Sequence, residues 1–83
     1  MKQDLFLNFV GGCWVNGRSV AVYRVDAGIK LVAEDQRGTP LGTSQTMSED
    51  MYWALMKRWC KGCTPPYDAA ITSAALDYML GES

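Results

Sequence analysis

The sequence contains no histidine, the residue that most often serves as a general base or as a nitrogen ligand of zinc. Its absence excludes Ser-His and Cys-His nucleophilic pairs. Enzymes without histidine rely on paired carboxylates, an activated lysine or a metal ion, yet the acidic residues here are scattered over predicted turns and helix starts. We therefore expect a non-catalytic protein that holds no metal ion and no cofactor.

Long hydrophobic runs and an excess of one charge are also missing. No apolar run is longer than a few residues, so we expect no membrane-spanning segment, and no secretory signal follows Met1. Eight Lys and Arg residues against nine Asp and Glu residues give a net charge of −1, which argues against a polyanion held by bulk charge. The sequence therefore predicts a cytoplasmic protein.

The size and composition are those of one small globular domain. Of the 83 residues, 48% are apolar and 20% are charged, which is ordinary for a soluble protein. We expect a single domain over residues 1–83. A domain of this size buries only about 60% of the surface that its unfolded chain exposes, so we expect a modest stability.

The first half of the chain has the two-residue period of β-strands. Alternation begins at Leu5, is interrupted by the glycine pair at 11–12 and resumes at 13–15, which predicts a bent first strand. Asn16-Gly17 then predicts a type I′ hairpin turn. Because Pro40 cannot donate to a ladder, the last strand should lie at an edge. Three strands follow the first, at residues 18–25, 29–34 and 39–46.

The second half changes to the period of α-helices. Thr46-Met47-Ser48-Glu49 fits a capping box at the start of a helix, and Gly62 is its predicted C-cap. The first helix carries one apolar stripe. After Pro65-Pro66 a second helix begins at residue 67 or 68 and ends at Gly81. The stripe of the first helix consists of Tyr52, Leu55, Met56 and Trp59, and that of the second of Ile71, Ala74, Ala75 and Tyr78.

These elements predict an α+β domain with the order ββββαα. Short turns between successive strands require an antiparallel meander, because parallel strands need long crossovers. Ile29, Leu31 and Ala33 should face the helices, and Lys30 and Glu34 should face away. We therefore expect two layers, a four-stranded sheet with both helices packed on one face.

The cysteines form one recognisable motif. Cys60-Lys61-Gly62-Cys63 has the spacing of zinc knuckles and dithiol redox sites. Only Cys13 remains as a further thiol ligand, which is too few for four-coordinate zinc, and the motif lies at the negative end of a helix dipole, which disfavours a thiolate. We interpret all three cysteines as reduced thiols. A small thiol or zinc protein centred on Cys60 and Cys63 is the second alternative to the function proposed below.

Nucleic-acid binding through the sheet is the first alternative. Trp14 or Tyr23 would supply stacking for such a site. However, alternation puts Arg24 on the same face as Val20 and Val22, which does not favour a single basic patch. The basic residues of the sheet half are Arg18, Arg24, Lys30 and Arg37.

The aromatic residues favour protein binding. Three tryptophans are more than a core of this size needs, and exposed Trp and Tyr are typical anchors of protein interfaces. We expect Trp14, Tyr23 and Trp53 to bind a partner; the alternative is that the core closes over them. Because neither sheet face is fully polar, a second copy of the chain is also a candidate partner, giving a homodimer.

We therefore expect a small protein that binds another protein. In its size, acidity and single-domain build, the chain is similar to phage or mobile-element inhibitors of host defence complexes, such as anti-CRISPR proteins. This resemblance implies a stoichiometric inhibitor that acts by steric occlusion.

Overall fold

The computed structural model describes residues 4–7, 9–60 and 69–81. These residues form four strands and two α-helices in the predicted order ββββαα, with a short 3-10 turn, η1 (Val10–Gly12), after the first strand. The strands are β1 (Asp4–Leu7), β2 (Arg18–Val25), β3 (Gly28–Asp35) and β4 (Pro40–Met47), and the helices are α1 (Glu49–Trp59) and α2 (Ala69–Leu80).

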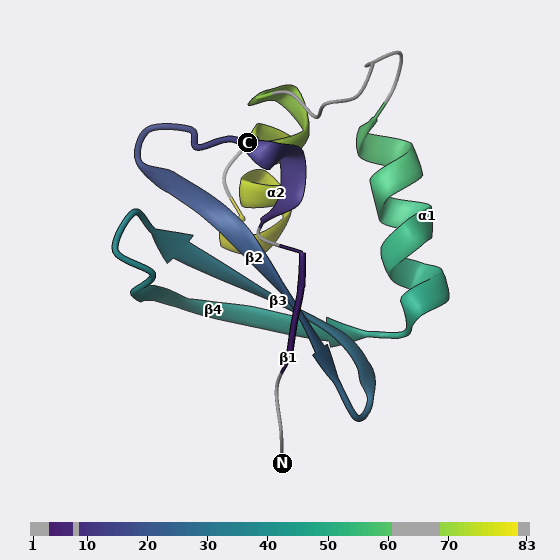
Figure 1. The fold of residues 1–83 in the computed structure, drawn as a ribbon. Coiled ribbons are helices and arrows are strands. Elements are labelled where there is room, and N and C mark those ends of the chain that lie inside the picture. Colours follow the sequence, from purple (N-terminus) through teal and green to yellow (C-terminus); the bar gives the residue numbers. More distant parts are fainter. Residues whose placement is uncertain (1–3, 8, 61–68, 82–83) are drawn as a thin grey trace.

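The strands form one antiparallel sheet in the order β1-β2-β3-β4, which confirms the predicted meander. β4 begins at Pro40 and lies at an edge of this sheet, as expected of a strand whose first residue cannot donate to a ladder. The helix α2 contacts β2, β3 and β4, and α1 contacts α2 and β3. Figure 1 shows β4 below the two helices.

The core lies between the sheet and the helices. Alternate residues of β2 and β3 point into it, which confirms that Ile29, Leu31 and Ala33 face the helices. Tyr52 and Met56 contribute from α1, and α2 contributes several residues. The core residues are Val10, Val20, Val22, Ile29, Leu31, Ala33, Tyr52, Met56, Ile71, Ala75, Leu76 and Met79.

The hairpin turn before β2 has the predicted conformation. Asn16 and Gly17 have φ values of 55° and 75°, the two positive values that a type I′ turn requires. Val15 N–H donates to the Arg18 carbonyl at 2.9 Å, and Arg18 N–H donates to the Val15 carbonyl at 3.0 Å. This turn fixes where β2 begins.

The predicted bent first strand is wrong beyond Leu7. Residues 10–12 form η1 instead, because Gly11 and Gly12 have φ values of 80° and 70° and turn the chain out of the sheet. Of the expected continuation at 13–15, only Val15 forms a bridge, and its partner is Arg18. The turn contacts α2, so the segment that follows β1 belongs to the helix layer.

The contact between η1 and α2 determines which face of α2 is buried. The Thr72 hydroxyl is buried and lies 2.8 Å from the Val10 carbonyl oxygen and 3.0 Å from the Cys13 carbonyl oxygen. The prediction placed Tyr78 on the buried stripe, but Tyr78 is exposed, and Thr72, Leu76 and Met79 are buried. Docking of Thr72 against η1 explains why the buried face is rotated from the predicted one.

The helix ends differ in part from the predicted ones. Ser48, not Thr46, is the N-cap of α1, and its Oγ accepts a hydrogen bond from Met51 N–H at 3.2 Å. Gly81, with φ of 70°, ends α2 as predicted, and its N–H donates to the Asp77 carbonyl at 2.9 Å. The expected C-cap Gly62 and the expected start of the second helix lie outside the described residues.

Candidate protein-interaction surfaces

The three predicted anchors lie in three different places. Trp53 is on α1, on the helix side of the sheet, where it contacts Phe6 and Tyr52. Tyr23 is on β2, opposite Lys30 and Leu5, on the face away from the helices. Trp14 lies between η1 and β2 and packs on Phe9. The structure therefore does not bring these residues together into one patch.

Trp53 belongs to a cluster that we call the aromatic seam, where β1 and β2 meet α1. Its members are Phe6, Arg24, Tyr52 and Trp53. The ring centroid of Trp53 lies 6.2 Å from that of Phe6 and 4.9 Å from that of Tyr52, and both contacts are edge-on. Phe6 and Tyr52 also meet edge-on at 5.9 Å. Edge-on contacts are a favoured geometry for aromatic pairs.

A cation completes the seam. The guanidinium carbon of Arg24 lies 4.5 Å from the centroid of the Phe6 ring, a cation–π distance. The same guanidinium forms an ion pair with Glu49 at 3.5 Å. Since both partners of this pair are about half exposed, the ion pair orients Arg24 more than it stabilises the fold. Phe6 thus contacts a cation as well as two aromatic rings.

Local sequence patterns position three residues of the seam, Arg24, Tyr52 and Trp53. Arg24 has the same parity on β2 as the buried Val20 and Val22, so it points to the helix side. On α1, Trp53 follows the fully buried Tyr52 and lies at the flank of the buried stripe. Trp53 therefore keeps 46% of its surface exposed while two rings restrict its orientation.

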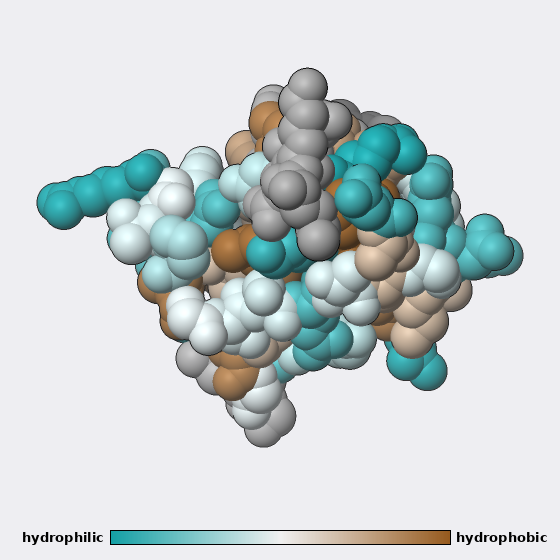
Figure 2. All heavy atoms as spheres, turned by 90° about the horizontal axis from the view of Figure 1, so that it is seen from below, coloured by the Kyte–Doolittle hydropathy of each residue, from teal (hydrophilic) through white to brown (hydrophobic). Residues whose placement is uncertain are grey.

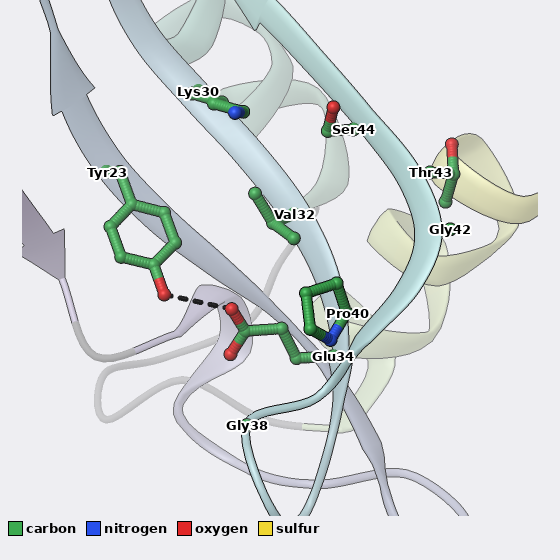
Figure 3. A pocket seen from close by; sticks show the side chains of 9 residues that line it. All are labelled: Tyr23, Lys30, Val32, Glu34, Gly38, Pro40, Gly42, Thr43 and Ser44. Atoms are coloured by element: carbon green, nitrogen blue, oxygen red, sulfur yellow. Dashed lines mark hydrogen bonds between the residues drawn. The ribbon is translucent and has the colours of Figure 1, made fainter. Parts of the chain in front are cut away.

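The second surface is the sheet face away from the helices, which we call the open face; Leu5, Ser44 and Thr46 at its edges are exposed, whereas Ala21 and Val32 near its middle keep only 4% and 9% of their surface exposed. A hollow of about 360 Å³ lies on this face. Figure 3 shows its lining side chains, with Tyr23 on β2 at one side and the β4 strand at the other. Val32 lies in its middle, and Lys30 and Glu34 lie toward its two ends. The open face consists of Leu5, Ala21, Tyr23, Lys30, Val32, Glu34, Ser44 and Thr46.

Tyr23 is tied to one end of the hollow. Its hydroxyl donates to Glu34 Oε2 at 2.9 Å. This hydrogen bond raises the pKa of Tyr23 above its usual value, and partial burial and the negative charge of Glu34 act in the same direction. The phenol therefore stays protonated near neutral pH and holds the carboxylate in one orientation.

Trp14 forms a smaller aromatic site. It is 40% exposed, and its ring centroid lies 5.2 Å from that of Phe9 with a tilt of 34°. No other described aromatic ring contacts either residue. Trp14 is thus accessible, as predicted, but it lacks the supporting cluster that surrounds Trp53.

The described residues offer little to the alternative functions. Arg24 and Lys30 point to opposite faces of the sheet, and Arg37 lies in the turn between β3 and β4, so these cations form no single patch. Among the described residues, no three His, Cys, Asp or Glu side chains lie close enough to hold a metal ion.

The cysteines correct one expectation. Cys13 is a free thiol whose sulfur lies 3.8 Å from the Thr72 hydroxyl, whereas Cys60 is disulfide-bonded. The interpretation of all three cysteines as reduced thiols is therefore wrong for Cys60. Cys63 lies outside the described residues, so the C-x-x-C motif as a whole is not described.

Sequence reasoning missed the supporting residues of the seam. For Arg24 the sequence did contain a signal, because alternation along β2 placed this residue on the same face as Val20 and Val22. Phe6, however, meets α1 only through tertiary packing between segments more than forty residues apart in the chain. No local pattern could have paired it with Trp53.

Comparisons with protein-family models, curated proteins and solved structures found no significant match. Within the part of the chain that the structure describes, no helix has both the length and the hydropathy of a membrane span.

Proposed function

We propose that this chain is a non-catalytic protein-binding module and that the aromatic seam is its partner-binding surface. The observation that carries the proposal is Trp53, which is 46% exposed yet contacts Phe6 and Tyr52 edge-on. Rigid aromatic side chains lose little conformational entropy on binding, which makes them effective anchors. Trp, Tyr and Arg are also the residues most enriched at binding hot spots.

The setting that we propose is inhibition of a larger complex in the cytoplasm. A phage or mobile-element protein that blocks a host defence complex by steric occlusion, as anti-CRISPR proteins do, needs an exposed binding surface and no catalytic group. The small size and the net charge of −1 support this proposal, as does the aromatic anchor. Nucleic-acid binding is less favoured, because the cations of the sheet point in different directions.

Replacing Trp53 tests the proposed surface. Trp53→Ala should weaken partner binding by about 2 kcal/mol or more, which is about thirty-fold in Kd, because it removes a pre-oriented anchor. The partner is captured with the tagged wild-type chain from its host, and its affinity for each variant is then measured by calorimetry. Tyr78→Ala is the control, since Tyr78 is also exposed and makes an edge-on contact of its own, with Trp59.

The thermal stability of the same variants separates binding from folding. Both substitutions remove an exposed ring, so we expect similar and small decreases in Tm. If Trp53→Ala left the affinity unchanged, or reduced it only in proportion to the unfolded fraction, the seam would not be the binding surface.

A further inference from the structure

The charges on the open face have an arrangement that the proposed function does not use. Along β3, Lys30 precedes Val32 by two residues and Glu34 follows it by two, so all three point to the same face. Figure 3 shows Val32 between the two charged side chains. The strand rise separates Lys30 and Glu34 by about 13 Å. The hollow therefore has a positive end and a negative end at equal distances from its centre.

We propose that the open face binds a second copy of this chain, with the two β3 strands antiparallel across the interface. A two-fold axis through Val32, perpendicular to β3 and parallel to the sheet, places Lys30 of each copy opposite Glu34 of the other. Stacked sheets pack about 10 Å apart with their strands nearly aligned, a spacing that long charged side chains can bridge. A homodimer of this kind carries two identical ion pairs.

The same charges exclude the other aligned arrangement. A two-fold axis along β3 would place Lys30 against Lys30 and Glu34 against Glu34, and like charges in an interface are strongly unfavourable. The order of charge along β3 therefore selects the antiparallel arrangement, in which both reciprocal contacts are attractive.

Lys30 and Glu34 are both able to form an ion pair with a second copy. The Tyr23 hydroxyl holds Glu34 through Oε2, which leaves the second carboxylate oxygen to accept from a lysine of the other copy. Among the described residues, no carboxylate forms an ion pair with Lys30. The pairing between copies would thus break no ion pair within either copy.

The size of the face indicates a weak, reversible dimer. Three strands about 26 Å long and one about 13 Å long, at a spacing of about 4.8 Å, give a flat footprint of about 440 Å² per copy. This is at the small end of specific interfaces. Figure 2, the view from below, shows hydrophobic residues as separate spots between hydrophilic ones on that side of the molecule. Charge pairing must therefore contribute much of the specificity.

Charge reversal tests the pairing. The masses of the full-length wild type, Lys30→Glu and Glu34→Lys are measured by sedimentation equilibrium from about 10 µM to about 1 mM, a range that covers weak dimers. Each single variant should raise the dimer Kd at least about ten-fold, because both reciprocal pairs become repulsive. An equimolar mixture of the two variants should form heterodimers, since one copy then carries two cations and the other two carboxylates. Lys57→Glu, the same change at an exposed position on α1, is the control and should leave the Kd unchanged.

Three outcomes would overturn the proposal. They are a wild type that is monomeric at about 1 mM, a dimer that resists both reversals, and two monomeric variants that fail to associate when mixed. Melting curves show that each variant is folded. This inference goes beyond the proposed partner binding, and the two proposals can fail independently. The seam lies on the helix side of the sheet, and partner binding there is tested separately with Trp53→Ala.

Discussion

A side chain at Gly11 would disrupt the contact that docks η1 onto α2. The φ of Gly11 is 80°, and a Cβ there would overlap the Thr72 hydroxyl that docks η1 onto α2. Gly11→Ala should therefore lower the free energy of unfolding by about 3 kcal/mol or more, from the left-handed backbone and the overlap together. For a domain of this size, the loss corresponds to a fall of about 12 °C or more in Tm.

Gly38→Ala is a close control for this substitution. Gly38 has the same φ of 80°, but nothing lies within 4 Å of the position of its Cβ. Its variant should therefore show only the backbone cost, about 1–2 kcal/mol. Equal losses of stability in the two variants, measured by urea unfolding, would show that the Thr72 contact contributes nothing.

Tyr23 should titrate above the usual range of a tyrosine. Its hydrogen bond to Glu34 raises the pKa of the phenol, with burial and the charge of Glu34 as further causes. A raised pKa in the folded state means that the associated stabilisation is complete below pH about 10 and is lost as the pH rises through the folded-state value. NMR titration of the labelled Tyr23 ring measures this pKa directly.

Removing the charge of Glu34 checks the cause. In Glu34→Gln the pKa of Tyr23 should fall toward its usual value, because the carboxylate acceptor is gone. Glu49→Gln removes an exposed carboxylate that pairs with Arg24 instead, and it should leave the titration unchanged. A Tyr23 pKa that is the same in all three proteins would contradict the structure at this contact.

At the scale of the elements, the N-cap of α1 is a position at which the structure differs from the residue that the sequence pattern predicted. Ser48 Oγ accepts from Met51 N–H, whereas Thr46 belongs to β4. Ser48→Ala should therefore cost about 1 kcal/mol, which is a fall of about 4–8 °C in Tm. Thr46→Ala removes the residue that the sequence pattern placed at the cap, and its loss should be smaller. Thermal unfolding followed by circular dichroism decides between them, and a larger loss for Thr46→Ala would reverse the assignment.

The elements themselves were largely predictable from the sequence. Alternation and turn residues predicted β2 with its observed ends, and Asn16-Gly17 predicted the hairpin before it, because these signals act between neighbouring residues. The predictions were wrong where contacts between distant segments determine the local structure. Residues 10–12 form η1 because Gly11 and Gly12 have positive φ values, and α2 is rotated because Thr72 docks against η1, a contact that no local pattern encodes.

For the interaction surfaces, the sequence predicted which residues would be accessible but not how they contact one another. Composition and helical phase indicated an accessible Trp53, and strand parity put Lys30 and Glu34 on the outer face. The sequence did not indicate that Phe6 and Arg24 support Trp53. It also did not indicate that Tyr23 orients Glu34, since that bond joins different strands. Such arrangements depend on how strands and helices pack in three dimensions.

At the scale of the whole molecule, the two surfaces are independent. Arg24 of the seam and Tyr23 of the open face are neighbours on β2 but point to opposite sides of the sheet. A second copy on the open face would therefore leave the seam of each copy accessible. The proposed dimer would then present two seams and could hold two partner molecules or two sites of one assembly.

Hydroxyl-radical footprinting of the captured complex measures directly whether the partner covers the seam. Oxidation of Trp53 should fall strongly when the partner is bound, because the partner then shields its ring. Tyr78, which is exposed on α2, should be oxidised as in the free chain. If Trp53 were oxidised equally in the free and the bound chain, the aromatic seam would not be where this protein binds its partner.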